Sequence, residues 1–126
     1  MNRQTTGKNG EHHARIYLEA RGYRVVAANW RSGRYEIDLV AEAPPGPWPV
    51  LAVVEVKTRH SGPHFDAHAA RGWGQRRRLV AAARAFVQSH PDFEKHHVRF
   101  DAVLVLASTL NPSPDVLHLP GAFRAE

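Results

Sequence analysis

The amino-acid sequence predicts an α/β fold, and three observations support this. Two stretches, residues 5–21 and 75–88, repeat apolar side chains with the spacing of a helix face. Between and after them, short runs rich in Val, Ile and aromatic residues are typical of strands. One such run, residues 50–58, is apolar enough to be a central strand covered on both faces. Since 126 residues suffice for one real core, we expect a single domain over residues 1–126.

The first helix is expected over residues 5–21, with Gly22 as the stop at its C-terminal end. Its apolar stripe consists of Ala14, Tyr17 and Leu18. Glu11 precedes Leu18 by seven positions and therefore lies on the same inward stripe. Two interpretations of Glu11 remain open: an acid that faces a functional site, or an acid of the first helical turn stabilised by the helix dipole.

A strand is expected over residues 23–29, and a hairpin-like connection follows it up to Arg34. In this connection Arg31 and Arg34 place positive charge beside the flat ring of Trp30. We favour contact of this group with a phosphate backbone over the alternative, a core tryptophan with two solvated arginines.

Two further strands are expected over residues 35–41 and 50–58. The stretch between them is rich in proline, which forbids a helix or a ladder, and we predict a stiff hairpin loop. Side chains alternate along a strand, so Glu55 and Lys57 project from one face of the later strand. In the earlier strand, Ile37 and Leu39 are expected to share one face, with Asp38 on the opposite face. If the two strands are neighbours, Asp38 meets Glu55 and Lys57 at one spot on the sheet.

This acid and lysine pattern predicts a metal-dependent site. Two carboxylates packed together repel each other unless a cation lies between them, and carboxylate oxygens are the ligands that Mg²⁺ prefers. A lysine beside them suits a site where phosphate charge develops or a water is positioned. The alternative for Glu55 and Lys57 is a structural ion pair. Because a buried pair is rarely a net gain over apolar residues, we favour the functional interpretation.

The second helix, expected over residues 75–88, has a clear apolar stripe. This stripe consists of Leu79, Ala83, Phe86 and Val87. Arg76, Arg77 and Arg78 occupy its first turn, where the helix dipole does not favour cations. We expect at least one of them to face an anion, and the alternative is a solvated basic end of the helix.

The net charge of +5 predicts an anionic partner, nucleic acid rather than a membrane surface. The alternative is a basic surface without a partner. The arginines expected to contact nucleic acid are Arg31, Arg34, Arg59, Arg76, Arg77 and Arg78. The absence of cysteine and of an apolar signal segment fits a cytoplasmic protein without a membrane partner.

The segment of residues 59–74 carries several glycines and a proline and is expected to be irregular. His60, His64 and His68 are spaced four apart, as metal ligands on a helix would be. Because Gly and Pro interrupt that spacing and no cysteine completes a zinc set, we predict a histidine-rich surface loop instead.

A fourth strand is expected over residues 98–106, then a turn, a short edge strand over residues 116–119 and a tail. Asp101 lies in the fourth strand. It is either a further acid near the site or an ion-pair partner in the neighbourhood of Arg99, and we prefer the structural role.

Five segments of the chain carry a resemblance to a known family. They are Gly7-x-x-Gly10-Glu11-x-x-Ala14-x-x-Tyr17-Leu18, Asn29-Trp30-Arg31, Glu36-Ile37-Asp38-Leu39-Val40, Val54-Glu55-Val56-Lys57-Thr58-Arg59 and Arg99-Phe100-Asp101. In this order they resemble the YraN-like family of small, poorly characterised bacterial proteins. That family is similar to the PD-(D/E)xK, restriction-endonuclease-like nucleases, in particular the archaeal Holliday-junction resolvases.

The resemblance implies an α-β-β-β-α-β core, with a mixed central sheet flanked by helices. It implies a metal-dependent endonuclease that acts on nucleic acid, with DNA of branched or otherwise non-regular structure favoured over RNA. Asp38 and Glu55 would hold Mg²⁺ or Mn²⁺ with help from the Val56 carbonyl. Lys57 would be the catalytic lysine, and Glu11 the acid carried by the first helix in the resolvase-like branch.

The chain departs from the family pattern at two positions. Tyr35 stands where the family usually has glycine, and Gln75 stands where it usually has lysine, although the arginines that follow could replace that charge. These departures leave open an alternative, a nucleic-acid-binding module of the same fold without nuclease activity. A third interpretation is an interaction domain whose basic face meets an acidic protein. A junction-cutting enzyme is expected to be a homodimer, because two symmetric strands need two sites.

Overall fold

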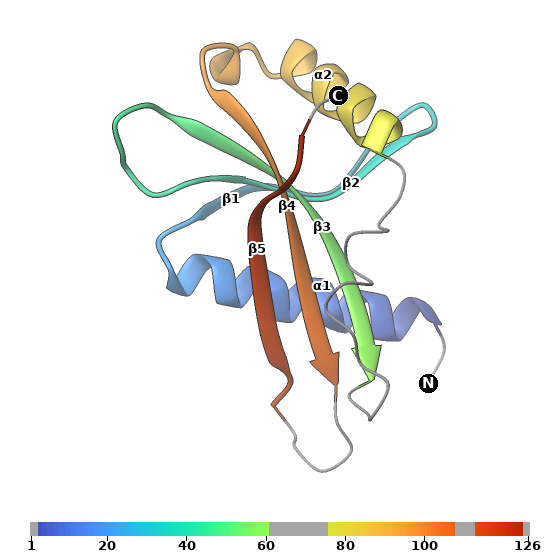
Figure 1. The fold of residues 1–126 in the computed structure, drawn as a ribbon. Coiled ribbons are helices and arrows are strands. Elements are labelled where there is room, and N and C mark those ends of the chain that lie inside the picture. The colour runs from blue at the N-terminus through green and yellow to red at the C-terminus, as the bar shows by residue number, and fades with distance from the viewer. Residues whose placement is uncertain (1–2, 61–75, 108–112, 125–126) are drawn as a thin grey trace.

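Five strands form one sheet in the order β1-β2-β3-β4-β5 (Figure 1). The computed structural model describes residues 3–60, 76–107 and 113–124, except for the side chains of residues 3–9, 60 and 76. The elements follow in chain order as α1 (Arg3–Ala20), β1 (Arg24–Ser32), β2 (Tyr35–Glu42), β3 (Val50–His60), α2 (Arg76–Ser89), the short 3-10 helix η2 (Pro91–Phe93), β4 (His97–Ala107) and β5 (Asp115–Phe123).

The sheet is mixed, as predicted. β3 and β4 are parallel, whereas the three other neighbouring pairs are antiparallel. A parallel pair needs a long crossover, and here the connection includes α2. The expected order α-β-β-β-α-β is therefore present, with β5 added at the edge of the sheet.

The C-terminal end of α1 is fixed by Gly22, as predicted. This glycine has a φ of 90°, which favours a residue without a Cβ atom. Its N–H donates to the Glu19 carbonyl at 3.0 Å and the Tyr23 N–H donates to the Leu18 carbonyl at 3.1 Å. These two bonds form a Schellman motif, which satisfies carbonyls at the end of the helix.

The β1–β2 hairpin is tighter than expected. The strand predicted to end at residue 29 continues to Ser32, which pairs with Tyr35. Only Gly33 and Arg34 remain as the turn, and Gly33 adopts a φ of 60°. The longer connection was therefore wrong, because pairing with β2 extends the strand past a polar stretch that has little strand propensity of its own.

β5 is also longer than predicted. The expected strand of residues 116–119 runs from Asp115 to Phe123, so most of the expected tail is strand. Phe123 pairs with Phe100 of β4, and the two rings stack with centroids 5.5 Å apart. A shift of register and Gly121, with a φ of 63°, let the strand bend between its two paired parts.

The sheet carries one helix on each face. α2 covers a cluster that includes Val40, Leu51, Val53 and Phe86. α1 contributes Ala14 and Leu18 to a second cluster, which includes Leu39, Ala52, Val54 and Val103. Residues of β3 alternate between the two clusters, as expected for a central strand buried on both faces. Figure 1 shows the two helices on opposite sides of the sheet.

Some predictions fall on residues 61–75, outside the described part of the chain. These are the histidine-rich loop with His64 and His68, and the departure at Gln75. Among the described residues, no helix is long and apolar enough to cross a membrane.

Candidate functional site

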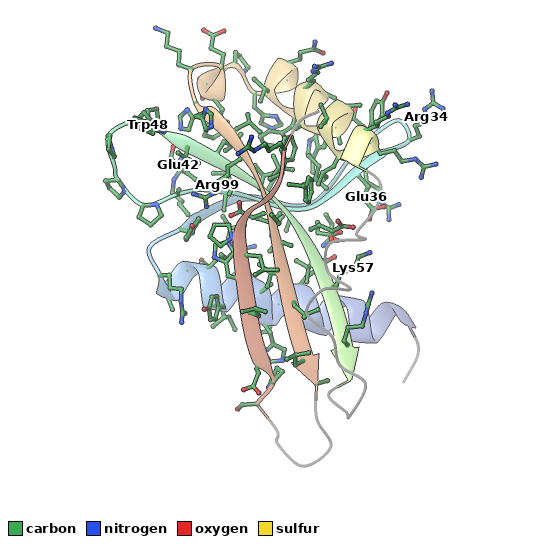
Figure 2. The ribbon with its side chains drawn as sticks, viewed as in Figure 1. Arg34, Glu36, Glu42, Trp48, Lys57 and Arg99 are labelled. Atoms are coloured by element: carbon green, nitrogen blue, oxygen red, sulfur yellow. The ribbon has the colours of Figure 1, made fainter. Side chains whose placement is uncertain are left out.

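Asp38, Glu55 and Lys57, three of the four predicted catalytic residues, line one cleft of about 600 Å³, whereas Glu11 is not among its lining residues. The cleft lies where β2 and β3 meet the first turns of α2. Its lining residues are Arg34, Tyr35, Glu36, Asp38, Val54, Glu55, Val56, Lys57, Arg78 and Leu79. Figure 2 shows Arg34 near the start of α2, with Glu36 and Lys57 on the same side of the molecule. The expectation that β2 and β3 are neighbours is confirmed.

Asp38 is attached to the neighbouring strand by a hydrogen bond. The β2–β3 pairing ends at Leu39 and Val54, and beyond it Asp38 Oδ2 accepts a bond of 2.8 Å from the Val56 N–H. A carboxylate thus takes the place of a backbone acceptor where the two strands separate. This bond holds the acid at the mouth of the gap between the strands.

The residues on either side of Asp38 depart from simple alternation. Ile37 and Leu39 were expected to share a face, but Ile37 packs in the cluster covered by α2 and Leu39 in the cluster covered by α1. The expectation was wrong because regular alternation breaks between these positions, next to the point where the pairing of β2 with β3 ends.

Burial raises the pKa of Asp38 to about 6. The hydrogen bond from Val56 opposes this, while the charges of Glu11, Glu55 and Glu36 raise the pKa further. Three carboxyl groups therefore repel the charged form of Asp38, and a cation bound at Asp38 would relieve this repulsion.

Glu11 reaches this region because α1 packs closely on β3. Gly10 is buried, and a Cβ atom at its position would clash with Thr58 Oγ1. The absence of a side chain therefore permits the close approach of the helix. Glu11 is partly buried and close enough to Asp38 to raise its pKa. Glu11 is therefore within electrostatic range of Asp38, whereas its role stays a prediction.

Lys57 and Glu55 form an ion pair, with Lys57 Nζ 3.2 Å from Glu55 Oε1. The sequence led us to expect a buried pair, but the side chains are 35% and 24% exposed. The cost of burying charge is therefore smaller than assumed and does not by itself favour function. What distinguishes this pair is that both side chains line the cleft that holds Asp38.

The carboxylates fit one type of Mg²⁺ site. In the described part of the chain, no group of three or more His, Asp or Glu side chains is arranged to hold a metal ion. Mg²⁺ is commonly bound by one or two carboxylates, with water and substrate phosphate completing its shell. Asp38 and Glu55, from neighbouring strands of one cleft, fit this type. The Val56 carbonyl remains a predicted third donor.

The predicted nucleic-acid-binding arginines divide into two groups. Arg34, Arg77 and Arg78 line a hollow next to the acid cleft. Arg31 is bonded to Glu36 at 3.4 Å, and Arg59 is exposed and donates to the Thr58 carbonyl at 2.9 Å. The side chain of Arg76 lies outside the described part.

Trp30 belongs to the core and does not extend the basic surface. It is partly buried and packs edge-on against Phe86 of α2, with ring centroids 5.3 Å apart. The structure supports the alternative of a tryptophan packed on the core, because α2 covers that part of the sheet. This is a long-range contact that local sequence does not indicate.

Glu36 is a site residue that we did not assign from the sequence. It lines the cleft and its charge contributes to the raised pKa of Asp38. Its position two residues before Asp38 was the available signal, because alternate residues of a strand share a face.

Asp101 has the structural role that we preferred. It is fully buried, and Arg99 donates to both of its carboxylate oxygens at 2.8 Å. His118 Nε2 lies 2.8 Å from Oδ2, and the Gly121 N–H donates to Oδ1 at 2.9 Å. Burial alone would raise the pKa of Asp101, but these contacts lower it below its ordinary value.

Comparison with known proteins gives a consistent result. The model of an uncharacterised protein family, UPF0102, matches residues 10–105. A UPF0102 protein of Rhodopseudomonas palustris is 41% identical over 120 residues, which cover 95% of this chain and 84% of the relative. A UPF0102 protein of Nitrobacter winogradskyi is 40% identical over 119 residues, which cover 94% of this chain and 92% of the relative. One from Synechococcus is 41% identical over 104 residues, which cover 81% of this chain and 76% of the relative. These names state no activity.

Proposed function

The chain belongs to the uncharacterised protein family UPF0102, and we propose that it is a metal-dependent endonuclease that hydrolyses phosphodiester bonds in nucleic acid. One observation carries this proposal. Asp38 from β2 and Glu55 with Lys57 from β3 line the same cleft, and arginines lie at its edge. Acids that hold a cation, a lysine and cationic side chains for phosphates are the groups that phosphodiester hydrolysis requires.

Each residue has a specific role in the proposed site. Asp38 and Glu55 hold Mg²⁺ or Mn²⁺, with the Val56 carbonyl as a further donor. The bound ion supplies a water of lowered pKa and neutralises charge on the phosphate. Lys57 positions the nucleophile or stabilises charge that develops on the phosphate. Glu11 orients water or adjusts the charge around the cation.

The fold supports the same proposal. The order α-β-β-β-α-β and the mixed sheet are those implied by the resemblance to restriction-endonuclease-like nucleases. The acids lie on the second and third strands, the positions that the PD-(D/E)xK pattern implies. We therefore propose that the chain has this fold and acts on DNA of branched or otherwise non-regular structure. A homodimer would provide the two sites that a symmetric junction requires.

Calorimetric titration with Mn²⁺ tests the acid site directly. Wild type and the double variant Asp38→Asn with Glu55→Gln are compared, and circular dichroism establishes that each is folded. We expect binding by wild type and none by the double variant. The matched control is Asp92→Asn with Glu94→Gln, two exposed acids near η2, which should bind like wild type. Equal binding by all three proteins would overturn the assignment of the acids.

The second candidate function is a nucleic-acid-binding module without nuclease activity. Two observations favour it: the described residues contain no three-ligand cluster, and Glu55 is already paired with Lys57. This module would bind nucleic acid in EDTA with strong salt dependence. Its affinity would survive Glu55→Gln, and no tested nucleic acid would be cleaved with Mn²⁺ present.

A further inference from the structure

Three arginines from two distant parts of the chain converge on one hollow. Arg34 lies in the β1–β2 turn, while Arg77 and Arg78 lie in the first turn of α2. Together with Tyr35 and Ala81 they line a hollow of about 230 Å³. We call it the arginine hollow. Figure 2 shows Arg34 at the tip of the hairpin, close to the start of α2.

The arginines of the hollow form no ion pair with an acid in the described part of the chain, whereas Arg31 and Arg24 pair with Glu36 and Glu42. The first turn of α2 contains no acidic residue. Positive charges gathered at the N-terminal end of a helix are unfavourable, because the helix dipole is positive there. Bound anionic charge would remove this cost.

The arginine hollow opens onto the acid cleft. Arg34, Tyr35 and Arg78 contribute to the walls of both. An anion in the hollow would therefore be a close neighbour of a group bound at Asp38 and Glu55. Neighbouring anionic groups are what consecutive phosphates of one nucleic-acid strand provide.

We infer that the arginine hollow is a subsite for one phosphate, the one next to the scissile phosphate on the same strand. Guanidinium groups suit this role, because their planar arrangement of donors matches phosphate oxygens. The three arginines act together on a single phosphate because they surround a single hollow. The position next to the scissile phosphate rests on the proposed nuclease function, whereas the phosphate subsite itself does not.

Binding in EDTA tests the subsite without any metal. A fluorescein-labelled single-stranded DNA oligonucleotide is titrated at several salt concentrations, and fluorescence anisotropy gives the affinity. The hollow variant carries Arg34→Gln, Arg77→Gln and Arg78→Gln. The control variant carries Arg15→Gln, Arg24→Gln and Lys95→Gln, which remove the same charge at exposed positions that line neither the hollow nor the acid cleft. Urea unfolding establishes that both are folded.

The salt dependence distinguishes one shared phosphate from three separate ones. Each phosphate contact on a single strand contributes about 0.7 to the slope of log affinity against log salt concentration. We expect the slope of the hollow variant to be smaller in magnitude than that of the control variant by about 0.7. A slope smaller by about 2 would indicate three separate phosphates and overturn a shared subsite. A slope equal to that of the control variant would overturn any subsite there.

Cleavage of modified substrates with Mn²⁺ tests the position of the subsite. An uncharged methylphosphonate is placed at the phosphate on either side of the cleaved bond. At one of these positions the methylphosphonate should lower kcat/KM of wild type by about tenfold or more, as expected for a lost charge-assisted contact. The same methylphosphonate should leave kcat/KM of the hollow variant unchanged. An equal response of both proteins would overturn the position. If wild type cleaves nothing, the proposed function fails while the salt dependence still decides the subsite.

Discussion

The Asp38 carboxylate of β2 accepts a hydrogen bond of 2.8 Å from the Val56 N–H of β3. This bond lies just beyond the last Leu39–Val54 pair of the two strands. It fixes the direction of the Asp38 side chain through the backbone of the neighbouring strand. The bond therefore positions the carboxylate before any cation binds, as a rigid scaffold does for a metal ligand. Because only Oδ2 takes part in this bond, Oδ1 can face a cation.

Asp38→Asn should stabilise the protein at pH 8. Asparagine keeps an oxygen for the Val56 N–H and removes a charge that is unfavourable among other acids. The folded pKa of Asp38 is about 6, above the unfolded value of about 3.9. Stability therefore falls as pH rises from about 4 to about 6, by up to about 3 kcal/mol. Urea unfolding in EDTA should show the variant more stable at pH 8 and equal to wild type at pH 4.

Asp115→Asn is the matched control for this experiment. Asp115 is exposed at the start of β5, and surface substitutions change stability by about 0.5 kcal/mol or less. The control should therefore follow wild type at both pH values. If Asp38→Asn were less stable than wild type at pH 8, the charged carboxylate would stabilise the folded protein. This would contradict the prediction that burial and the neighbouring acids make its charge unfavourable.

Lys57→Ala should abolish cleavage and preserve Mn²⁺ binding. The lysine is paired with Glu55 at 3.2 Å. Its removal leaves the negative charge of Glu55 unbalanced, which strengthens the attraction of Glu55 for a cation. Calorimetry should therefore show an affinity equal to or higher than that of wild type. Rate measurements on the same preparation should show no cleavage, because the positioning of water or the stabilisation of phosphate charge is lost.

An arginine that does not line the cleft provides a control for Lys57. Arg31 is exposed and paired with Glu36, so Arg31→Ala removes one positive charge near the site without removing the lysine. It should retain cleavage, with weaker substrate binding at most. A drop in Mn²⁺ affinity for Lys57→Ala as large as that for Asp38→Asn would contradict the role assigned to the lysine.

The features predicted well from the sequence depend on local periodicity. The apolar stripe of α2 is confirmed, with Ala83 and Phe86 buried, because helical spacing alone identifies an inward face. The meeting of Asp38 with Glu55 also followed from alternation along two strands and a short connection. These signals lie within one element or between neighbours in the chain.

The features that were missed depend on pairing between distant segments. β5 continues to Phe123 because that residue pairs with Phe100 of β4, although its own stretch contains Pro and Gly. The arginine hollow joins Arg34 with Arg77 and Arg78 only because α2 begins beside the hairpin. No spacing along the chain indicates such contacts, so the individual arginines were predicted and their convergence was not.

Gly10→Ala should destabilise the protein although it improves helix propensity. A methyl group there would clash with Thr58 Oγ1 of β3, so either the Thr58 side chain or α1 must shift. Overpacking of this kind costs about 1–3 kcal/mol, against a gain of up to about 1 kcal/mol from replacing a helical glycine. Urea unfolding should show the loss, and Mn²⁺ affinity should change with it if Glu11 contributes to the charge around the cation.

Thr58→Ala provides the test of this packing. It removes the hydroxyl that the new methyl group would meet and leaves only the Thr58 Cβ at 3.4 Å. The double variant Gly10→Ala with Thr58→Ala should therefore recover most of the stability lost by Gly10→Ala alone, a coupling measured by a double-mutant cycle. Additive losses would mean that the two positions are not in contact.

Asp101→Asn should cost about 3–5 kcal/mol at pH 7, as expected when one partner of a buried ion pair is lost. Asparagine can still accept from the Gly121 N–H, but the buried Asp101 charge that balances Arg99 is gone. Glu19→Gln is the contrasting control. Glu19 pairs with exposed Arg15 at 3.2 Å, and such surface pairs contribute about 1 kcal/mol or less.

The effect of Asp101→Asn should shrink in acid. The contacts of Asp101 hold its folded pKa below the ordinary value despite its burial, so the stabilisation is complete above the unfolded pKa of about 3.9. It is lost as pH falls through the folded pKa, because protonation then removes the charge in wild type as well. Urea unfolding at pH 7 and in increasingly acidic buffer should therefore show the two proteins converging. A difference that stays constant into strong acid would mean that asparagine disturbs packing around Arg99 and that the charge of Asp101 is not the source of stability.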